Sequence, residues 1–181
     1  MTGHHGMRPQ DIVILLKIIS IGHRSWQQRD LATGLGISVS EISVSLNRSQ
    51  IAGLVDGTKK RVHRQALLEF LQHGVRYVFP EMPGSVVIGM PTAHSHPYFQ
   101  EKFISVEKYV WPDSNGQVRG QAIDPLHPGV PGAAVKDPVL YQLLASVDIL
   151  RVGKKREIET ASALLKKMIL QDPDDIIPLI L

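Results

Sequence analysis

Three histidines in a proline-rich stretch offer the sequence's best candidate for a metal site. His94 and His96 project to the same side if their segment is extended, and His127 could supply a third nitrogen ligand. No cysteine, no helical His-Glu-x-x-His arrangement and no clear carboxylate ligand accompanies them. We therefore expect turn histidines in a surface loop, with neither a bound metal nor another cofactor.

The residue patterns of other enzyme classes are missing as well. The sequence has no Ser-His-Asp context, no Gly-x-Ser-x-Gly motif and no glycine-rich phosphate loop, and its paired acids Asp174 and Asp175 lie near the end of the chain. Without cysteine there is no thiol nucleophile, and the composition suits a reducing compartment. We predict a cytoplasmic protein that is not an enzyme. A metal-using enzyme built on the histidine segment remains the third hypothesis, after the two functions described below.

A run of basic residues offers a different chemistry, the neutralisation of phosphate groups. Positions 59–64 are Lys-Lys-Arg-Val-His-Arg and hold five potentially cationic side chains. The first 80 residues carry ten Lys or Arg against five Asp or Glu, whereas the remainder is mildly acidic. Because this asymmetry is expected when one part of a chain meets a polyanion, the run predicts contacts with a nucleic-acid backbone.

Hydrophobic spacing predicts the helices that must position this run. Three helices with short connections are expected at residues 10–21, at residues 26–34 after an N-cap at Ser25, and from the N-cap Ser38 to about Ala52. A fourth helix is expected over residues 64–77. The segment between the third and fourth helices is too short for two strands of usual length, so any wing hairpin there would be minimal.

The second and third predicted helices carry the residue types of a helix-turn-helix. A small residue lets the two helices approach, a glycine accommodates the turn, and branched apolar residues fill the wedge between them. These residues are Ala32, Gly36, Ile37, Ile42 and Leu46, with Gly53-Leu54-Val55 following the third helix. With this pattern, residues 10–80 resemble the helix-turn-helix of winged-helix transcriptional regulators, particularly MarR-like ones. The resemblance implies sequence-specific binding of double-stranded DNA by a homodimer.

The candidate DNA contacts divide between the third helix and the basic run. The helix contributes Ser38, Ser40, Glu41, Ser43, Val44, Asn47 and Arg48, and the run contributes Lys59, Lys60, Arg61 and Arg64. The helix has no Lys or Arg before Arg48, so the usual bidentate guanine contact is missing. We expect Ser43 and Asn47 to discriminate between bases and the basic run to contact phosphates.

The remaining chain predicts an irregular insertion followed by helices. Nine of the twelve prolines lie between positions 80 and 138, where a strand is expected at Val86–Met90 and a β-hairpin at Val106–Trp111 with Gln117–Ile123. Asp137-Pro138 predicts the start of a long helix. After Gly153, a narrow apolar seam of the kind that packs against another helix is formed by Ile158, Ala161, Leu165 and Met168.

We therefore predict a mainly α protein with a small β component, divided into three parts. These are a winged helix-turn-helix domain at 8–79, an insertion with a β-hairpin at 80–137, and a C-terminal helical oligomerisation element at 138–181. The seam favours a homodimer, with packing against the first helix of the same chain as the alternative. The rival function is a protein-interaction module, such as an antitoxin-like or partner subunit on the same scaffold. No apolar run approaches the roughly 18 residues of a membrane span.

Overall fold

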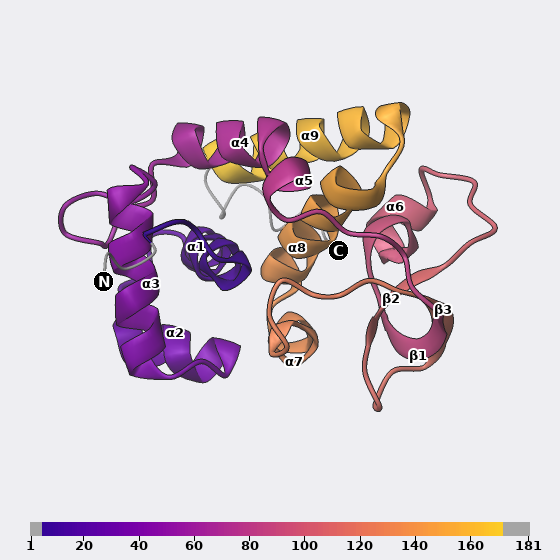
Figure 1. Ribbon diagram of the computed structural model, residues 1–181, viewed down its shortest axis with the longest axis horizontal. Coiled ribbons are helices and arrows are strands. Elements are labelled where there is room, and N and C mark those ends of the chain that lie inside the picture. Colours follow the sequence, from indigo (N-terminus) through magenta and orange to yellow (C-terminus); the bar gives the residue numbers. More distant parts are fainter. Residues whose placement is uncertain (1–4, 172–181) are drawn as a thin grey trace.

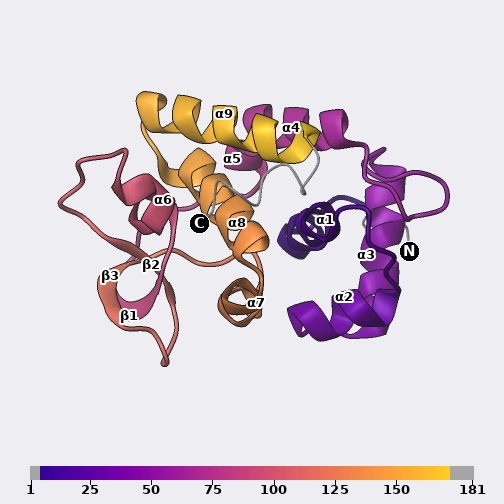
Figure 2. The same ribbon diagram turned by 180° about the vertical axis from the view of Figure 1, so that it is seen from behind.

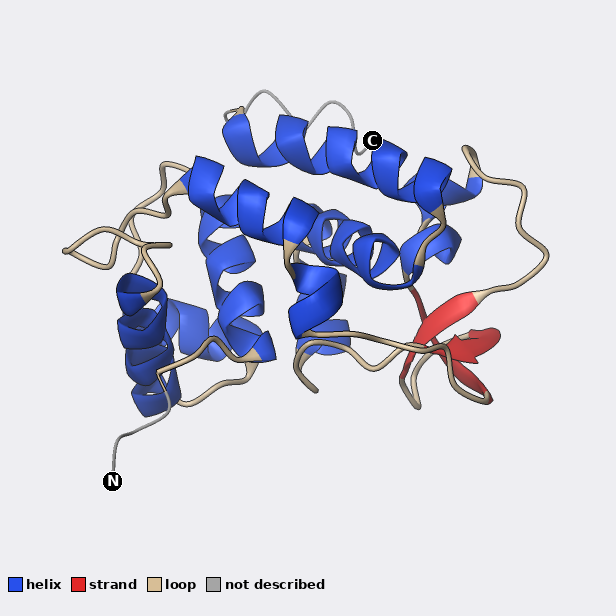
Figure 3. Ribbon diagram, turned by 45° about the horizontal axis from the view of Figure 1, so that its top comes forward, coloured by secondary structure: helices blue, strands red, loops and turns tan. Residues whose placement is uncertain are grey.

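Residues 5–171, which this computed structural model describes, are mainly helical and include a small sheet (Figures 1 and 3). The first half contains α1 (Pro9–Ile21), α2 (Gln28–Leu35), α3 (Val39–Ile51), α4 (Arg64–His73) and α5 (Val75–Val78). The second half contains β1 (Val86–Pro91), η1 (Ala93–Ser95), α6 (Pro97–Gln100), β2 (Tyr109–Pro112), β3 (Val118–Ala122), α7 (Val130–Lys136), α8 (Pro138–Val152) and α9 (Lys155–Leu170). The expected fold class, mainly α with a small β component, is confirmed.

Side-chain caps explain where the second and third helices begin. The Asp30 carboxylate accepts the backbone N–H of Gln27 at 2.7 Å, so α2 starts after Gln27 and not after the predicted cap Ser25. Ser38 Oγ accepts the backbone N–H of Glu41 at 3.2 Å, as predicted for the third helix. In both cases a polar side chain satisfies an N–H group that has no partner within the helix.

The predicted fourth helix is interrupted at Gly74. The backbone leaves regular helical geometry there, and α5 continues the chain for one further turn. A Cβ on residue 74 would lie 3.0 Å from both the ring and the carbonyl oxygen of Phe70. Glycine therefore allows a close approach that a larger residue would oppose.

The three strands do not form the predicted hairpin. β2 and β3 each pair antiparallel with β1, and with each other they pair in parallel. Gly89 in β1 is opposite Pro112 at the end of β2 and Val118 at the start of β3, so the chain crosses β1 between the two strands. A Cβ on Gly116 would lie 2.3 Å from the Gly89 carbonyl carbon. The glycines thus permit a crossing in place of the expected turn.

A buried polar network fixes the insertion onto α8. Asp148 is 2 % exposed and accepts hydrogen bonds from Thr92 Oγ1, Trp111 Nε1 and Arg151 Nη1 at 2.7, 2.7 and 2.9 Å. Burial raises the pKa of Asp148, although these three donors oppose the rise. Arg151 also donates to the Phe79 carbonyl and to the Glu81 carboxylate. The irregular segment is therefore tied at several points to one helix.

Asp137 has the predicted capping role and a second one. Its Oδ1 accepts the backbone N–H of Leu140 at 2.9 Å, which confirms the expected start of α8. Its Oδ2 accepts hydrogen bonds from Lys17 Nζ at 2.6 Å and Ser20 Oγ at 2.7 Å. One carboxylate thereby joins the start of α8 to α1.

The predicted seam on α9 is buried within the chain. Ala161 and Leu165 are fully buried and Met168 is 1 % exposed, whereas Ile158 is half-buried. The seam packs against α8 and α4, and α4 lies alongside α9 in both Figure 1 and Figure 2. The seam is therefore not the open dimer surface we expected, and its partners are α8 and α4 rather than α1. Residues 172–181 of the predicted C-terminal element lie outside the described residues.

Candidate nucleic-acid interface

The turn between α2 and α3 has the geometry that its residue types predict. Gly36 adopts a left-handed backbone conformation with φ of 66°, and its N–H bonds the carbonyl of Ala32. Ile37, Ile42 and Leu46 are 6 %, 0 % and 1 % exposed, so they fill the space between the helices as expected. The packing leaves the opposite face of α3 toward solvent.

The solvent face of α3 carries mainly short, uncharged side chains. Ser40, Val44 and Asn47 are exposed and Ser43 is half-buried. Glu41 is half-buried, and its carboxylate accepts a hydrogen bond from Gln10 Nε2 at 3.2 Å. The face thus offers hydroxyl and amide groups together with one exposed valine, which are groups able to meet base edges and thymine methyls.

Arg48 does not belong to this face, and the prediction that it contacts DNA is wrong. Its side chain is 6 % exposed and forms a two-pronged ion pair with the fully buried Asp11. Nε and Nη2 donate to the two carboxylate oxygens at 2.9 and 2.6 Å. The hydrogen bond to Asp11 raises the pKa of Arg48, so the guanidinium keeps its charge, and the contact links α3 to α1.

Residues 54–63, which we call the basic loop, connect α3 to α4. Val55 and Val62 form a single antiparallel bridge, in agreement with the expectation of a minimal hairpin. Asp56 organises the loop, since its carboxylate accepts hydrogen bonds from Thr58 Oγ1 and from the backbone N–H groups of residues 60 and 61. The Thr58 hydrogen bond holds the pKa of Asp56 below its usual value. Lys59 has a positive φ of 59°, which closes the turn.

The cations of this loop have different surroundings. Lys59 Nζ donates to Asn47 Oδ1 on α3, which brings together two of the predicted DNA contacts. Lys60 Nζ donates to the Trp26 carbonyl at 2.7 Å and lies 4.1 Å from the centre of its indole ring. The Arg61 side chain is exposed, with no hydrogen bond or ion pair to another described residue.

Arg64 differs from the cations of the basic loop. It is half-buried at the start of α4, and its Nη1 donates to the carbonyl of Ile169 at 2.7 Å. A longer hydrogen bond of 3.4 Å joins the same nitrogen to the Gln171 carbonyl. Arg64 therefore anchors the end of α9, and its predicted role as a phosphate contact has no support from this geometry.

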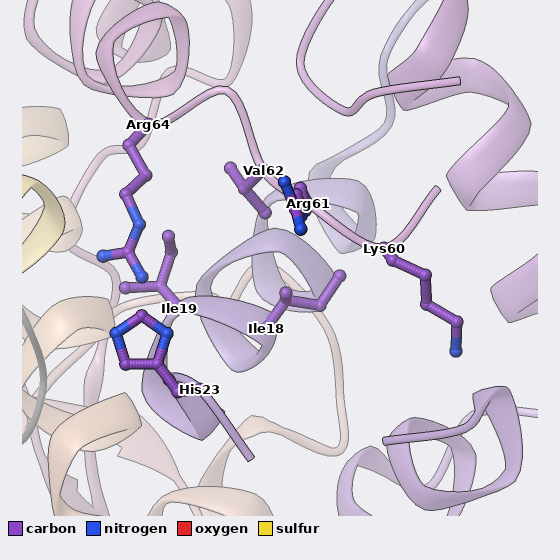
Figure 4. A pocket seen from close by; sticks show the side chains of 8 residues that line it. Ile18, Ile19, His23, Lys60, Arg61, Val62 and Arg64 are labelled. Carbon is purple, nitrogen blue, oxygen red and sulfur yellow. The ribbon is translucent and has the colours of Figure 1, made fainter. Parts of the chain in front are cut away.

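A pocket of about 390 Å³ lies between the end of α1 and the basic loop. Figure 4 shows the apolar side chains of Ile18, Ile19 and Val62 with the nitrogen-bearing side chains of His23, Lys60, Arg61 and Arg64. His23 and Trp26 also belong to this region, which their positions in the sequence did not predict. Each precedes the helix-turn-helix pattern, and neither spacing nor motif connects it to residues 60–64.

The three candidate metal ligands are not brought together. His94 is buried, with Nε2 lying 2.8 Å from Glu157 Oε2. Burial lowers the pKa of His96 to about 4, and it also lowers the pKa of His127. The Nδ1 atoms of His96 and His127 accept backbone N–H groups two residues further on, at 3.2 and 3.0 Å. Across residues 5–171, no group of three acidic, histidine or cysteine side chains is arranged to hold a metal ion.

Comparisons with protein-family models, with characterised proteins and with solved structures found no match for this chain. Among the helices of the described region, none combines the length and hydropathy needed to cross a membrane. The interpretation of the interface therefore depends on its geometry, above all on the contact between Lys59 and Asn47.

Proposed function

We propose that this protein binds double-stranded DNA through the exposed face of α3 and the basic loop, and that it regulates transcription. The hydrogen bond from Lys59 Nζ to Asn47 Oδ1 carries the proposal, because it joins the basic loop to the exposed face of α3. Recognition of DNA needs cations that fix the protein on the phosphates beside a surface that reaches base edges. Here the two parts are adjacent.

The arrangement is that of a helix-turn-helix with a reduced wing. α3 enters the major groove, Asn47 hydrogen-bonds an adenine edge, and Val44 contacts a thymine methyl. Because the exposed face of α3 is neutral, Lys59 and Arg61 supply the phosphate contacts and most of the salt-dependent affinity. The proposal includes a cytoplasmic location.

A dimer on two half-sites would need a surface other than the α9 seam. Leu165 and its neighbours in the seam are already buried against α8 and α4. We therefore keep the homodimer as part of the proposal but remove the seam from its interface. Half-sites one helical turn apart are the spacing that such a dimer would recognise.

The test is the salt dependence of binding to fluorescein-labelled duplexes of random sequence, measured by fluorescence anisotropy. Replacing Lys59, Lys60 and Arg61 by Ala should weaken binding to all duplexes and make the slope of log K against log salt shallower by about two to three. The control replaces Lys154, Lys155 and Arg156, an exposed run of the same composition at the start of α9. An equal loss of DNA affinity in both triple variants, or no loss in either, would contradict the proposal.

Asn47→Ala separates sequence discrimination from phosphate contact. The substitution should reduce the preference for the selected sequence by about 1–3 kcal/mol while binding to random DNA changes less. A selection from randomised duplexes, followed by competition with the unselected pool, measures both quantities. An equal loss on selected and random DNA would show that Asn47 only positions the protein.

The rival function, a protein-interaction module, is favoured by one observation. α3 exposes three apolar side chains, Val39, Val44 and Ile51, at 49 %, 47 % and 64 %, and its one arginine is buried. Such a face also suits an apolar partner surface. The rival predicts no measurable affinity for random duplexes at low salt, and the anisotropy experiment therefore decides between the two functions.

A further inference from the structure

An open hollow of about 580 Å³ lies between the solvent face of α3 and the segment that leads into α1. Among the described residues, its lining consists of His5 and Arg8 from that segment and of Val44, Asn47, Arg48, Gln50 and Ile51 from α3. All of these residues except Arg48 are exposed. The hollow is therefore part of the same α3 face that the proposed function places on DNA.

The hollow combines two amide groups with two branched apolar side chains. Asn47 and Gln50 each carry a donor and an acceptor, the two groups that together pair with N6 and N7 of adenine in the major groove. Val44 and Ile51 are seven residues apart, about two helical turns, so they lie on one face of α3. Apolar side chains of this kind suit the C5-methyl group of thymine, which a T·A pair presents in the same groove.

Guanine is less well matched to this face of α3. Its O6 and N7 atoms are both acceptors, and proteins usually bind them with a bidentate Arg or Lys. The arginine of α3, Arg48, is held by Asp11 through two hydrogen bonds. Lys59, whose Nζ donates to Asn47 Oδ1, is close enough to α3 to meet a guanine instead, and the experiment below therefore includes it.

Arg8 contributes a cation to the hollow from outside α3. Its backbone N–H donates to Asp11 Oδ2 at 2.8 Å, and the same oxygen accepts Arg48 Nε at 2.9 Å. A fully buried carboxylate thus fixes the position of Arg8 beside α3. The Arg8 guanidinium makes only a weak ion pair within the described residues, since Nη1 lies 4.0 Å from Glu41 Oε1 and both side chains are solvent-accessible. A DNA phosphate would be a stronger partner.

We propose that this hollow receives the methyl groups of thymine in adjacent A·T pairs, so that the protein selects A·T-rich DNA and distinguishes thymine from uracil. Val44 and Ile51 contact the methyl groups, and the amides of Asn47 and Gln50 hydrogen-bond the adenine edges. Arg8 binds a flanking phosphate. The inference rests on the proposed function and deepens it, because it names the base pairs that α3 reads.

The experiment compares three labelled duplexes of 20 base pairs by fluorescence anisotropy. The first contains only A·T pairs in mixed order, the second has deoxyuridine in place of every thymidine, and the third contains only G·C pairs. We expect the uracil duplex to bind at least about fourfold more weakly than the thymine duplex, since burial of one methyl group contributes about that factor. The G·C duplex should bind more weakly still. Equal affinity for the thymine and uracil duplexes would overturn the proposal.

A double substitution assigns the methyl contacts to the two apolar side chains. Val44→Ser/Ile51→Ser should bind the thymine and uracil duplexes with equal affinity, because the apolar partners of the methyl group are gone. Val39→Ser is the matched control, since Val39 is exposed on the same helix but does not line the hollow. It should keep the wild-type ratio of the two affinities. An unchanged ratio in the double variant would overturn the assignment.

Arg8→Ala tests the phosphate contact. It should weaken binding to the A·T and G·C duplexes by the same factor and make the slope of log K against log salt shallower by about one. Arg156→Ala, which removes an exposed arginine of α9, should leave the slope unchanged. An unchanged slope in Arg8→Ala would overturn this role. A preference for the G·C duplex that disappears in Arg8→Ala or Lys59→Ala would overturn the proposal in favour of a guanine contact.

The same duplexes separate failure of this inference from failure of the proposed function. Equal binding to all three duplexes, with a steep salt dependence, would overturn the selection of A·T pairs and leave DNA binding intact. No binding to any duplex at low salt would refute the proposed function, and the inference with it.

Discussion

Arg48→Met tests whether the arginine of α3 is a structural residue or a DNA contact. In the folded protein Asp11 is fully buried, and Arg48 supplies two of its hydrogen bonds, at 2.9 and 2.6 Å. Methionine has a similar length but no charge, so the substitution leaves the Asp11 carboxylate buried, with the Arg8 N–H as its one remaining donor among the described residues. Removing one partner of such a pair costs about 3–5 kcal/mol of folding free energy. That is a large share of the 5–15 kcal/mol typical of a domain.

The assay is urea unfolding at pH 7, followed by far-ultraviolet circular dichroism. Asp11→Asn/Arg48→Met should lose less than the sum of the two single substitutions, because the unpaired buried charge is gone in the double variant. Arg29→Met, an exposed control on α2, should remain within about 0.5 kcal/mol of the wild type. A loss below about 1 kcal/mol for Arg48→Met, together with a selective loss of DNA affinity, would refute the structural role.

Three further predictions concern folding. Leu165→Asp should unfold the protein, seen by circular dichroism, because Leu165 is fully buried; a folded variant would contradict the packing of α9. Gly36→Ala should destabilise the protein by about 1 kcal/mol in urea, since the φ of 66° strains any residue with a Cβ; an unchanged midpoint would argue against the left-handed turn. His96, whose pKa burial lowers from 6.5 to about 4, stays neutral in the folded state while the unfolded chain binds a proton. Neutral His96 therefore makes its full contribution to the free energy of unfolding above pH 6.5, and this contribution falls by about 3 kcal/mol as the pH drops to 4. His96→Gln should remove this part of the pH dependence of unfolding; an unchanged pH dependence would contradict the assignment.

Local patterns predicted most of the helices because their signals lie within a few residues. Ser38 caps α3 and Asp137 caps α8, and each bonds an N–H only three residues away. The spacing of Ile42 and Leu46 likewise places both on the face that is buried. Ser25 failed as a cap because Asp30, within the same helix, already satisfies the N–H of Gln27.

The features that sequence reasoning missed depend on partners far along the chain. Arg48 and Asp11 are 37 residues apart, and no spacing rule connects them. Lys60 meets Trp26 across 34 residues, so the basic run alone does not show which of its cations remain exposed. The strand crossing at Gly89 follows from three-dimensional close packing, and the sequence between β2 and β3 has the length and residues of an ordinary hairpin.

The central claim is that α3 and the basic loop together contact DNA. Titration of the ¹⁵N-labelled protein with a 20-base-pair duplex, followed by amide chemical shifts, tests it directly. We expect the largest shifts at Ser40, Val44, Asn47, Lys59 and Arg61, with little change in β1–β3. Shifts that are absent at low salt, or that centre on the exposed Val86 and Ile88 of β1, would contradict the claim.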